Sequence, residues 1–180
     1  MGFAEHLSGW RAGSVYSIPG GEFFTELLIV SGRGTPNGVT YDSRNKKLFV
    51  AVYSEEAVEV YDVAEDHQSL IHITTVALGT GPDNLFVDDS GVVYAGCLPV
   101  MHTVMTTMSD CGNAAKIAPS QVLRIEFSPD YKGYEITEVY SNDGREISAS
   151  TVAVRHGKQL LIGSVCRRPL LCTVTDVSML

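Results

Sequence analysis

The stretch GPDNLFVD, residues 81–88, decides the fold of this chain because the chain repeats it. The stretch TPNGVTYD, residues 35–42, aligns with it. In both copies Asn or Asp follows the proline, an apolar residue stands two positions further on, and aspartate ends the copy. Pro82 follows Pro36 by 46 residues, inside the roughly 40–50 residue period of propeller blades. Residues 148–154, SASTVAV, form a degenerate third copy with hydroxyl side chains. Each copy predicts a turn that brings an oxygen-bearing side chain to the mouth of a short inner strand.

Strand patterns follow each copy of the repeat. The apolar run at 47–53 is typical of a strand buried on both faces, and the strict alternation at 58–63 is typical of a half-buried one. With a hairpin of 14–18 and 22–30 around the turn 19–21, the chain is expected to form groups of two, four, four and three strands. The predicted strands are 39–42, 47–53, 58–63 and 71–78; 85–88, 92–97, 122–127 and 134–140; and 151–154, 160–165 and 170–174.

These groups predict an all-β fold, a β-propeller of four-stranded antiparallel blades. The chain holds roughly three blades, about half of a closed ring. We expect residues 1–180 to form a single partial β-propeller domain. Its parts are the end of one blade (10–34), a full blade (35–80), a full blade (81–143) with an inserted loop (98–120), and an incomplete blade (147–174). Open blade edges predict self-association.

Composition excludes several function classes. The formal net charge of −8 argues against nucleic acid as a partner. No apolar run approaches the roughly 20 residues needed to span a bilayer, so no transmembrane segment is expected. The first ten residues lack the basic start and apolar core of a signal peptide. No Gly-x-Ser-x-Gly elbow supports a serine hydrolase, and the four cysteines lack zinc-ligand spacing.

The inserted loop at 98–120 carries methionines among Thr and Ser residues. It is either a mobile rim loop over a pocket or a surface excursion whose methionines pack on a neighbouring blade. Both readings stay open on the sequence.

Several short motifs together resemble the C-terminal half of the paraoxonase/arylesterase family. In family order they are GSVY at 13–16, PNGV at 36–39, PDNLFVD at 82–88, AGC at 95–97, VLRI at 122–125, STVA at 150–153 and LIGSV at 161–165. The pair Asp83-Asn84 followed by Gly96-Cys97 is the most specific of them.

The resemblance implies a six-bladed propeller with calcium in its central tunnel and hydrolysis of aryl esters or lactones. Asn37, Asp83 and Asn84 match family positions that ligate calcium, while Thr151 and Leu98 match positions at the substrate pocket. The family's remaining ligands and its histidine bases match no residue here, so we expect no catalytic residue in this half. The chain alone is expected to be weakly active or inactive.

The same resemblance bears on the cysteines. Cys172 resembles a cysteine whose family partner is absent here, so it is expected to be free or bonded between chains, and Cys97 resembles an unpaired family cysteine. A local bridge from Cys166 to Cys172 is the alternative, if their Cα atoms lie within about 7 Å.

Chemistry agrees with the implied calcium site, because calcium prefers hard oxygen ligands such as amide and carboxylate groups. The alternative is that Asn37 and Asp83 are ordinary turn residues. Of the five histidines, only His102 in the inserted loop could reach a pocket, and a solvated position is its alternative. Asp42, Asp62 and Asp88 are expected to cap turns.

Two functions from different classes therefore remain. The first is a calcium-dependent arylesterase or lactonase, a carboxylic-ester hydrolase acting on small esters or lactones. The second is a non-catalytic propeller fragment or interaction module, a truncated product lacking the catalytic half. The resemblance suggests a secreted or membrane-associated protein, although the chain shows no signal or anchor.

Overall fold

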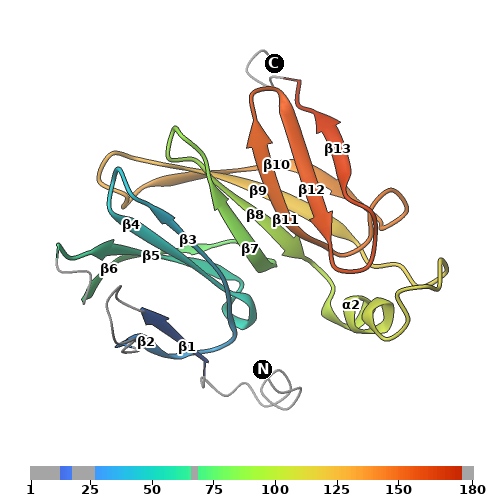
Figure 1. Cartoon of the computed structure of the whole chain (residues 1–180), viewed down its shortest axis with the longest axis horizontal. Helices are drawn as coiled ribbons and strands as arrows, with labels where there is room; N and C mark the ends of the chain where they lie inside the picture. The colour runs from blue at the N-terminus through green and yellow to red at the C-terminus, as the bar shows by residue number, and fades with distance from the viewer. Residues whose placement is uncertain (1–12, 18–26, 66–68, 176–180) are drawn as a thin grey trace, which may run out of the picture.

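The structure is a computed structural model that describes residues 13–17, 27–65 and 69–175 (Figure 1). The regular secondary structure of the described residues is nearly all β-strand. Three antiparallel sheets of four, four and three strands follow a two-stranded hairpin, as the sequence predicts. This architecture is that of a partial propeller. The predicted turn at 19–21 and His67 lie outside the described residues.

Every sheet consists of strands that are consecutive in the chain. The hairpin is β1 (Gly13–Ser17) and β2 (Leu27–Arg33). The first sheet is β3 (Pro36–Asp42), β4 (Lys47–Val52), β5 (Ala57–Val63) and β6 (Leu70–Ala77). The second sheet is β7 (Gly81–Val87), β8 (Val93–Leu98), β9 (Ser120–Phe127) and β10 (Tyr134–Asn142). The third sheet is β11 (Ser150–His156), β12 (Gln159–Ser164) and β13 (Leu170–Thr173).

The core lies between neighbouring sheets, and β8 shows why its sequence is continuously apolar. Val93, Ala95 and Cys97 face the first sheet, where they join Phe49 and Val58 in one buried cluster. Tyr94, at an alternate position of β8, faces the other way and joins a second cluster with the third sheet, which includes Ala153, Leu160 and Ile162. A middle strand packed on both faces has no solvent-facing positions.

Neighbouring sheets approach closely at two contacts, and a glycine without a side chain lies at each of them. A Cβ on Gly38 would overlap the backbone of Asp83 and Asn84 in β7. A Cβ on Gly96 in β8 would overlap the backbone of Thr151 and Val152 in β11. Backbone therefore packs directly on backbone where the sheets converge.

Two of the three aspartates expected to cap turns do so. Asp42 accepts hydrogen bonds from the backbone N–H groups of Arg44 (3.0 Å) and Asn45 (3.3 Å). Asp88 accepts hydrogen bonds in the same way from Ser90 and Val92. Asp62 differs: it lies within β5 and pairs with Lys47 across the strands, at 2.5 Å. That prediction was wrong because Asp62 lies inside a strand, near its end, where burial gives way to partial exposure and Lys47 of the neighbouring strand is within reach. The strand is also more buried than the half-buried one expected at 58–63, since residues 57–61 are all buried.

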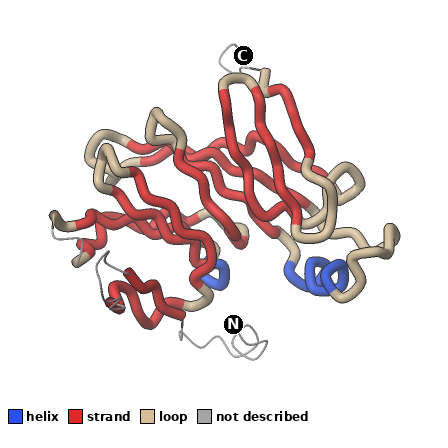
Figure 2. The backbone as a smooth tube through the Cα atoms, in the orientation of Figure 1, coloured by secondary structure: helices blue, strands red, loops and turns tan. Residues whose placement is uncertain are grey.

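The inserted loop carries the helix α2 (Met101–Met108). Figure 2 shows α2 and the short helix η1 (Tyr53–Glu55) on the same side of the sheets. Among the described residues no helix is long and apolar enough to cross a membrane.

The loop that follows α2 is bonded to the third sheet by a disulfide between Cys111 and Cys166. Cys97 and Cys172 are free, so the alternative bridge from Cys166 to Cys172 does not form. Neither reading of the inserted loop describes it fully: it is folded, and its methionines line a cavity.

Candidate functional site

Each inner strand carries an irregularity near its first residues, at the same relative place. In β3 it falls between Pro36 and Val39, and in β7 between Pro82 and Leu85. In β11 it falls between Ser150 and Val152. A bulge adds a residue to one strand of a pair and turns side chains away from the regular alternation. The residues in these bulges are Asn37 and Gly38, Asp83 and Asn84, and Thr151.

The inner strands begin earlier than the sequence suggests. We expected these strands to begin at residues 39, 85 and 151, with Asn37 and Asp83 in the turns that precede them. Strands β3, β7 and β11 instead start at Pro36, Gly81 and Ser150. The polar residues therefore sit inside hydrogen-bonded strands, where the bulges turn them aside.

Three of these bulge side chains open on one cavity of about 250 Å³. Its polar lining comes from Asn37, Asp83 and Thr151, together with Tyr53 from η1. The remaining lining is apolar and comes from β8, α2 and the turn after β12: Leu98, Met101, Val104, Met105, Met108 and Val165. The cavity thus has a polar floor on the inner strands and an apolar wall.

Asp83 is the only acidic residue in the cavity lining. Its side chain is buried, and burial raises the pKa of its carboxyl to about 6. A hydrogen bond with Asn37 offsets part of that rise, since it favours the ionised form. No ion pair joins Asp83 to a cationic side chain of the described residues. A buried carboxylate of this kind gains from a nearby cation.

Tyr53 belongs to the cavity although the sequence analysis did not select it. Its hydroxyl donates a hydrogen bond to the carbonyl oxygen of Leu98, at 3.2 Å. Burial, followed by the negative charges of Glu56 and Asp83, raises the pKa of Tyr53 to about 12. Its ring lies against Gly81, where a Cβ would overlap it. The phenol is therefore a fixed, neutral wall beside the Asp83 carboxyl.

The structure brings together four of the five residues selected from the sequence: Asn37, Asp83, Leu98 and Thr151. Asn84 follows Asp83 in the same bulge, is partly exposed and does not line the cavity. His102 is on α2 but exposed, and no described histidine lines the cavity. Sequence alone could have suggested Tyr53 only through its place directly after the buried strand β4.

A larger groove of about 600 Å³ lies at the other end of β7 and β11. Its Arg124 forms a paired hydrogen bond with Glu126, at 2.6 and 2.5 Å, so its charge is already balanced. We place the candidate site in the smaller cavity, where the unpaired carboxyl lies.

The donor atoms in the smaller cavity fit calcium in kind. Calcium takes 6–8 oxygen ligands, and amide and carboxylate oxygens are among them. Asn37 and Asp83 supply one amide and one buried carboxylate, and the amide lowers the pKa of that carboxyl. The described residues hold no group of three or more His, Cys, Asp or Glu residues suited to a metal. The donor atoms are thus of the kind that calcium binds, but they are too few to fill its coordination shell.

The sequence of the chain matches a known protein family over most of its length. The model of the family described as Arylesterase matches residues 9–174 of the chain. This chain belongs to the arylesterase family. The match covers all three sheets and the cavity, so it extends the resemblance of the short motifs to almost the whole sequence.

Curated relatives match over most of this chain. Mechanosensory abnormality protein 6 of Caenorhabditis elegans is 33% identical over 164 residues, which are 91% of this chain and 42% of that protein. Serum paraoxonase/lactonase 3 of Mus musculus is 30% identical over 146 residues, 81% of this chain and 39% of that protein. The chain spans about two fifths of the length of these relatives.

Solved structures support the fold alone. A luciferin-regenerating enzyme has a TM-score of 0.53 and 15% identity, over 86% of this chain and 44% of that chain. A functionally unknown protein from Desulfotomaculum acetoxidans has a TM-score of 0.56 and 15% identity, over 88% of this chain and 46% of that chain.

Proposed function

We propose that this chain supplies one side of a calcium-dependent arylesterase or lactonase site. The observation that carries the proposal is the buried Asp83 carboxyl, hydrogen-bonded to Asn37 and raised in pKa by burial, at the floor of a cavity with an apolar wall. Membership of the arylesterase family supports ester hydrolysis as the reaction class.

Each part of the cavity has a role in this proposal. Asp83 and Asn37, which line the cavity, would hold the ion, and Asn84 from the same bulge would supply a third oxygen from just outside the present lining. Calcium, when bound, supplies a positive charge that stabilises the oxyanion formed from an ester carbonyl. The Thr151 hydroxyl lies on the same floor and can hydrogen-bond a substrate oxygen. The methionine side chains of α2 and Leu98 contact the apolar part of the ester and exclude water from it.

The proposal extends to the architecture. We infer that the sheets are blades of a six-bladed ring, with residues 1–180 as one partial propeller domain. Within it, 35–80 and 81–143 are full blades and 147–174 an incomplete one. Further ligands and the base for the reaction would come from a complementary half.

Calcium titration of the chain by calorimetry tests the site. Three oxygen donors from the protein with one carboxylate should bind weakly, with a dissociation constant of roughly 10⁻⁴–10⁻³ M. The substitution Asp83→Ala removes the sole charged donor and should weaken binding at least about tenfold, because an electrostatic interaction in a buried site is lost. Asp89→Ala is the matched control, since Asp89 is a fully exposed acid in the turn after β7.

Activity is measured alongside binding with an aryl ester and a lactone, with and without calcium, for the chain alone and mixed with a complementary half from a relative. Calcium-dependent hydrolysis that Asp83→Ala abolishes supports the proposal. Binding that is equal in the wild type and in Asp83→Ala would show that the metal site lies elsewhere.

A second candidate function is a non-catalytic propeller fragment that acts as an interaction module. The incomplete set of metal donors among the described residues favours it. Ester and lactone hydrolysis, measured with calcium and the complementary half both present, distinguishes the two functions. The hydrolase should show activity under these conditions, and the interaction module should show none.

We further propose that the chain self-associates through the third sheet. Val154, Leu161 and Leu171 pair across its strands and form one apolar row, exposed by 37%, 45% and 60%. The opposite face of this sheet is buried against the second sheet. Exposed apolar rows of this kind promote association.

Sedimentation velocity over a range of concentrations should therefore show species larger than the monomer. Leu161→Lys should shift the chain towards monomer, because a charge interrupts the apolar row. Ile71→Lys is the control, since Ile71 is exposed on the edge strand of the first sheet. A wild-type chain that stays monomeric at every concentration would contradict the proposal.

A further inference from the structure

The helix α2 forms most of the apolar wall of the candidate cavity but has little to hold it in place by itself. It has eight residues, and its N-terminal capping residue is Val100, which makes no side-chain capping bond. Isolated helices of this length are marginal in water. The side chain of Val104, on the buried side of α2, packs with Leu98, Ala118 and Ala149. Met105 and Met108 follow Val104 on the face of α2 that lines the cavity, and they are partly exposed.

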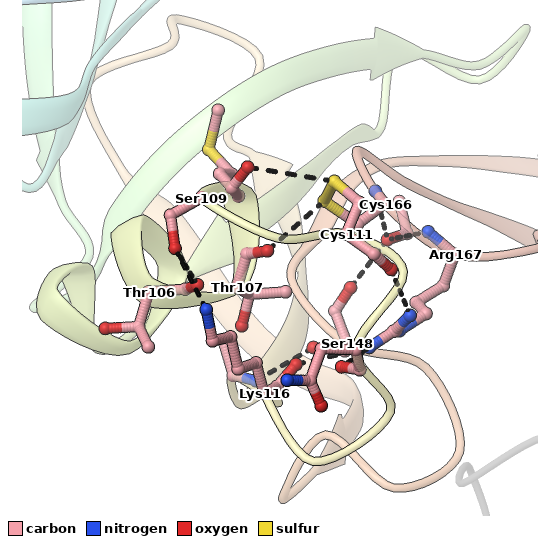
Figure 3. Close-up of a disulfide and its surroundings, with 12 residues drawn as sticks. Thr106, Thr107, Ser109, Cys111, Lys116, Ser148, Cys166 and Arg167 are labelled. Carbon is pink, nitrogen blue, oxygen red and sulfur yellow. Dashed lines mark hydrogen bonds between the residues drawn. A yellow bond between two sulfur atoms is a disulfide. The ribbon is translucent and has the colours of Figure 1, made fainter.

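Covalent and polar contacts instead fasten the loop that follows α2. Cys111 is joined to Cys166, in the turn between β12 and β13, with a Cα–Cα distance of 5.0 Å. Arg167 donates hydrogen bonds to the carbonyl oxygens of Cys111, Asn113 and Lys116, at 2.5, 2.9 and 3.2 Å. Figure 3 shows the disulfide and the Arg167 side chain reaching the same loop.

The turn that presents Cys166 and Arg167 is itself fixed. The Ser164 hydroxyl accepts hydrogen bonds from the backbone N–H groups of both residues, at 3.2 and 3.1 Å, and donates one to the carbonyl oxygen of Ser148. Ser148 in turn accepts a hydrogen bond from the N–H of Ala118 at the end of the inserted loop. The turn that carries Cys166 and the end of the inserted loop are thus both hydrogen-bonded to Ser148, just before β11.

We propose that the Cys111–Cys166 disulfide and Arg167 form a clamp that positions α2 as the wall of the cavity, and that a dithiol reductant releases it. In the release the dithiol transfers two electrons and two protons to the disulfide. Two thiols form on the protein, and the reductant becomes a disulfide. Cys111, Cys166 and Arg167 are positioning residues, because none of them lines the cavity.

The disulfide dominates this clamp. The hydrogen bonds of Arg167 lie at or near the surface, where water competes for the same carbonyl groups. With the disulfide reduced, these bonds and the packing of Val104 and Thr107 must hold an eight-residue helix whose partly exposed methionines gain little from burial. We therefore expect α2 to open locally while the strands of the second sheet stay closed.

Hydrogen exchange read by mass spectrometry tests the clamp without a substrate. At short labelling times, dithiothreitol should speed exchange of the α2 amides at least about tenfold, while β8 and β9 stay protected although the whole chain is less stable. The double variant Cys111→Ser/Cys166→Ser should exchange fast at α2 both with and without reductant. Because Cys97 and Cys172 are free thiols, reductant has no other disulfide to act on in the described chain.

Arg167 is tested by three single variants in the presence of reductant, where its contribution is not masked by the disulfide. Arg167→Ala should speed α2 exchange further, and Arg167→Lys should restore part of the protection, since it keeps one donor group. Arg168→Ala is the matched control, because Arg168 is the exposed neighbour in the same turn.

The outcomes separate a clamp from a general structural role. At short labelling times, faster exchange confined to α2 supports the clamp. Equal acceleration of exchange in α2 and in all sheets at those times, or none at α2 after reduction, overturns it. The inference uses the proposed function only in taking this cavity as the substrate site. If the chain proves inactive while α2 still responds to dithiothreitol, the function fails and the clamp stands.

Discussion

Gly96→Ala is expected to destabilise the chain by about 3 kcal/mol or more, because it adds a methyl group where two backbones meet. A Cβ on Gly96 would lie far inside 3.0 Å of the Thr151 and Val152 backbone, a spacing that real side chains do not reach. Backbone cannot rotate out of the way as a side chain can. Either β8 or β11 must shift, and the core between the second and third sheets then loses contact.

Denaturant unfolding followed by circular dichroism measures this effect. Gly112→Ala is the matched control: the same methyl group is added where only the Asp110 side chain lies nearby, at 3.9 Å, and the backbone is not left-handed. The control should lie within about 0.5 kcal/mol of the wild type, as surface substitutions usually do. Equal unfolding midpoints for Gly96→Ala and the control would refute direct backbone packing at this contact.

Loss of the disulfide is expected to destabilise the chain by about 4 kcal/mol, since the bond closes a loop between cysteines 55 residues apart. Such a link restricts the unfolded chain, and its entropic effect grows with the loop it closes. The variant Cys111→Ser/Cys166→Ser is compared with Cys172→Ser, which changes a free, half-buried cysteine.

Thermal and denaturant unfolding of both variants, without reductant, checks the expectation. The double variant should unfold at markedly lower denaturant concentration, whereas Cys172→Ser should stay near the wild type. Wild-type stability that does not change on adding dithiothreitol would contradict the assigned role of the bond.

Much of the fold could be predicted from the repeat, because each blade of a propeller repeats the same sequence pattern at a fixed spacing. Aligning Pro36 with Pro82 was enough to predict two full sheets, and the alternation of apolar residues placed their strands. The same alignment brought Asn37 and Asp83 to matching positions, and they share the cavity floor in the structure. What it missed is that these residues lie in strand bulges, since a bulge depends on the partner strand and leaves no local pattern.

Features set by contacts distant in sequence could not be predicted. The α2 helix has a run of Thr and Met without a capping residue, so propensity gave no reason to expect it. The pairing of Cys111 with Cys166 depends on where the inserted loop folds back on the third sheet. Asn84 was selected because it matches a family position that ligates calcium, and in the structure it lies in the same bulge as Asp83 without lining the cavity.

The order of strands within the sheets has a consequence for how the chain is made. Every strand pair in the described residues joins neighbours along the chain, so a sheet can close its hydrogen bonds once its own strands leave the ribosome. A nascent chain stalled beyond residue 77 should already protect the amides of β3 to β6 from exchange; an unprotected first sheet would exclude this. Glycine contacts such as Gly38 on β7 must wait for the following sheet. Synthesis and assembly would then proceed in the same direction, one sheet at a time.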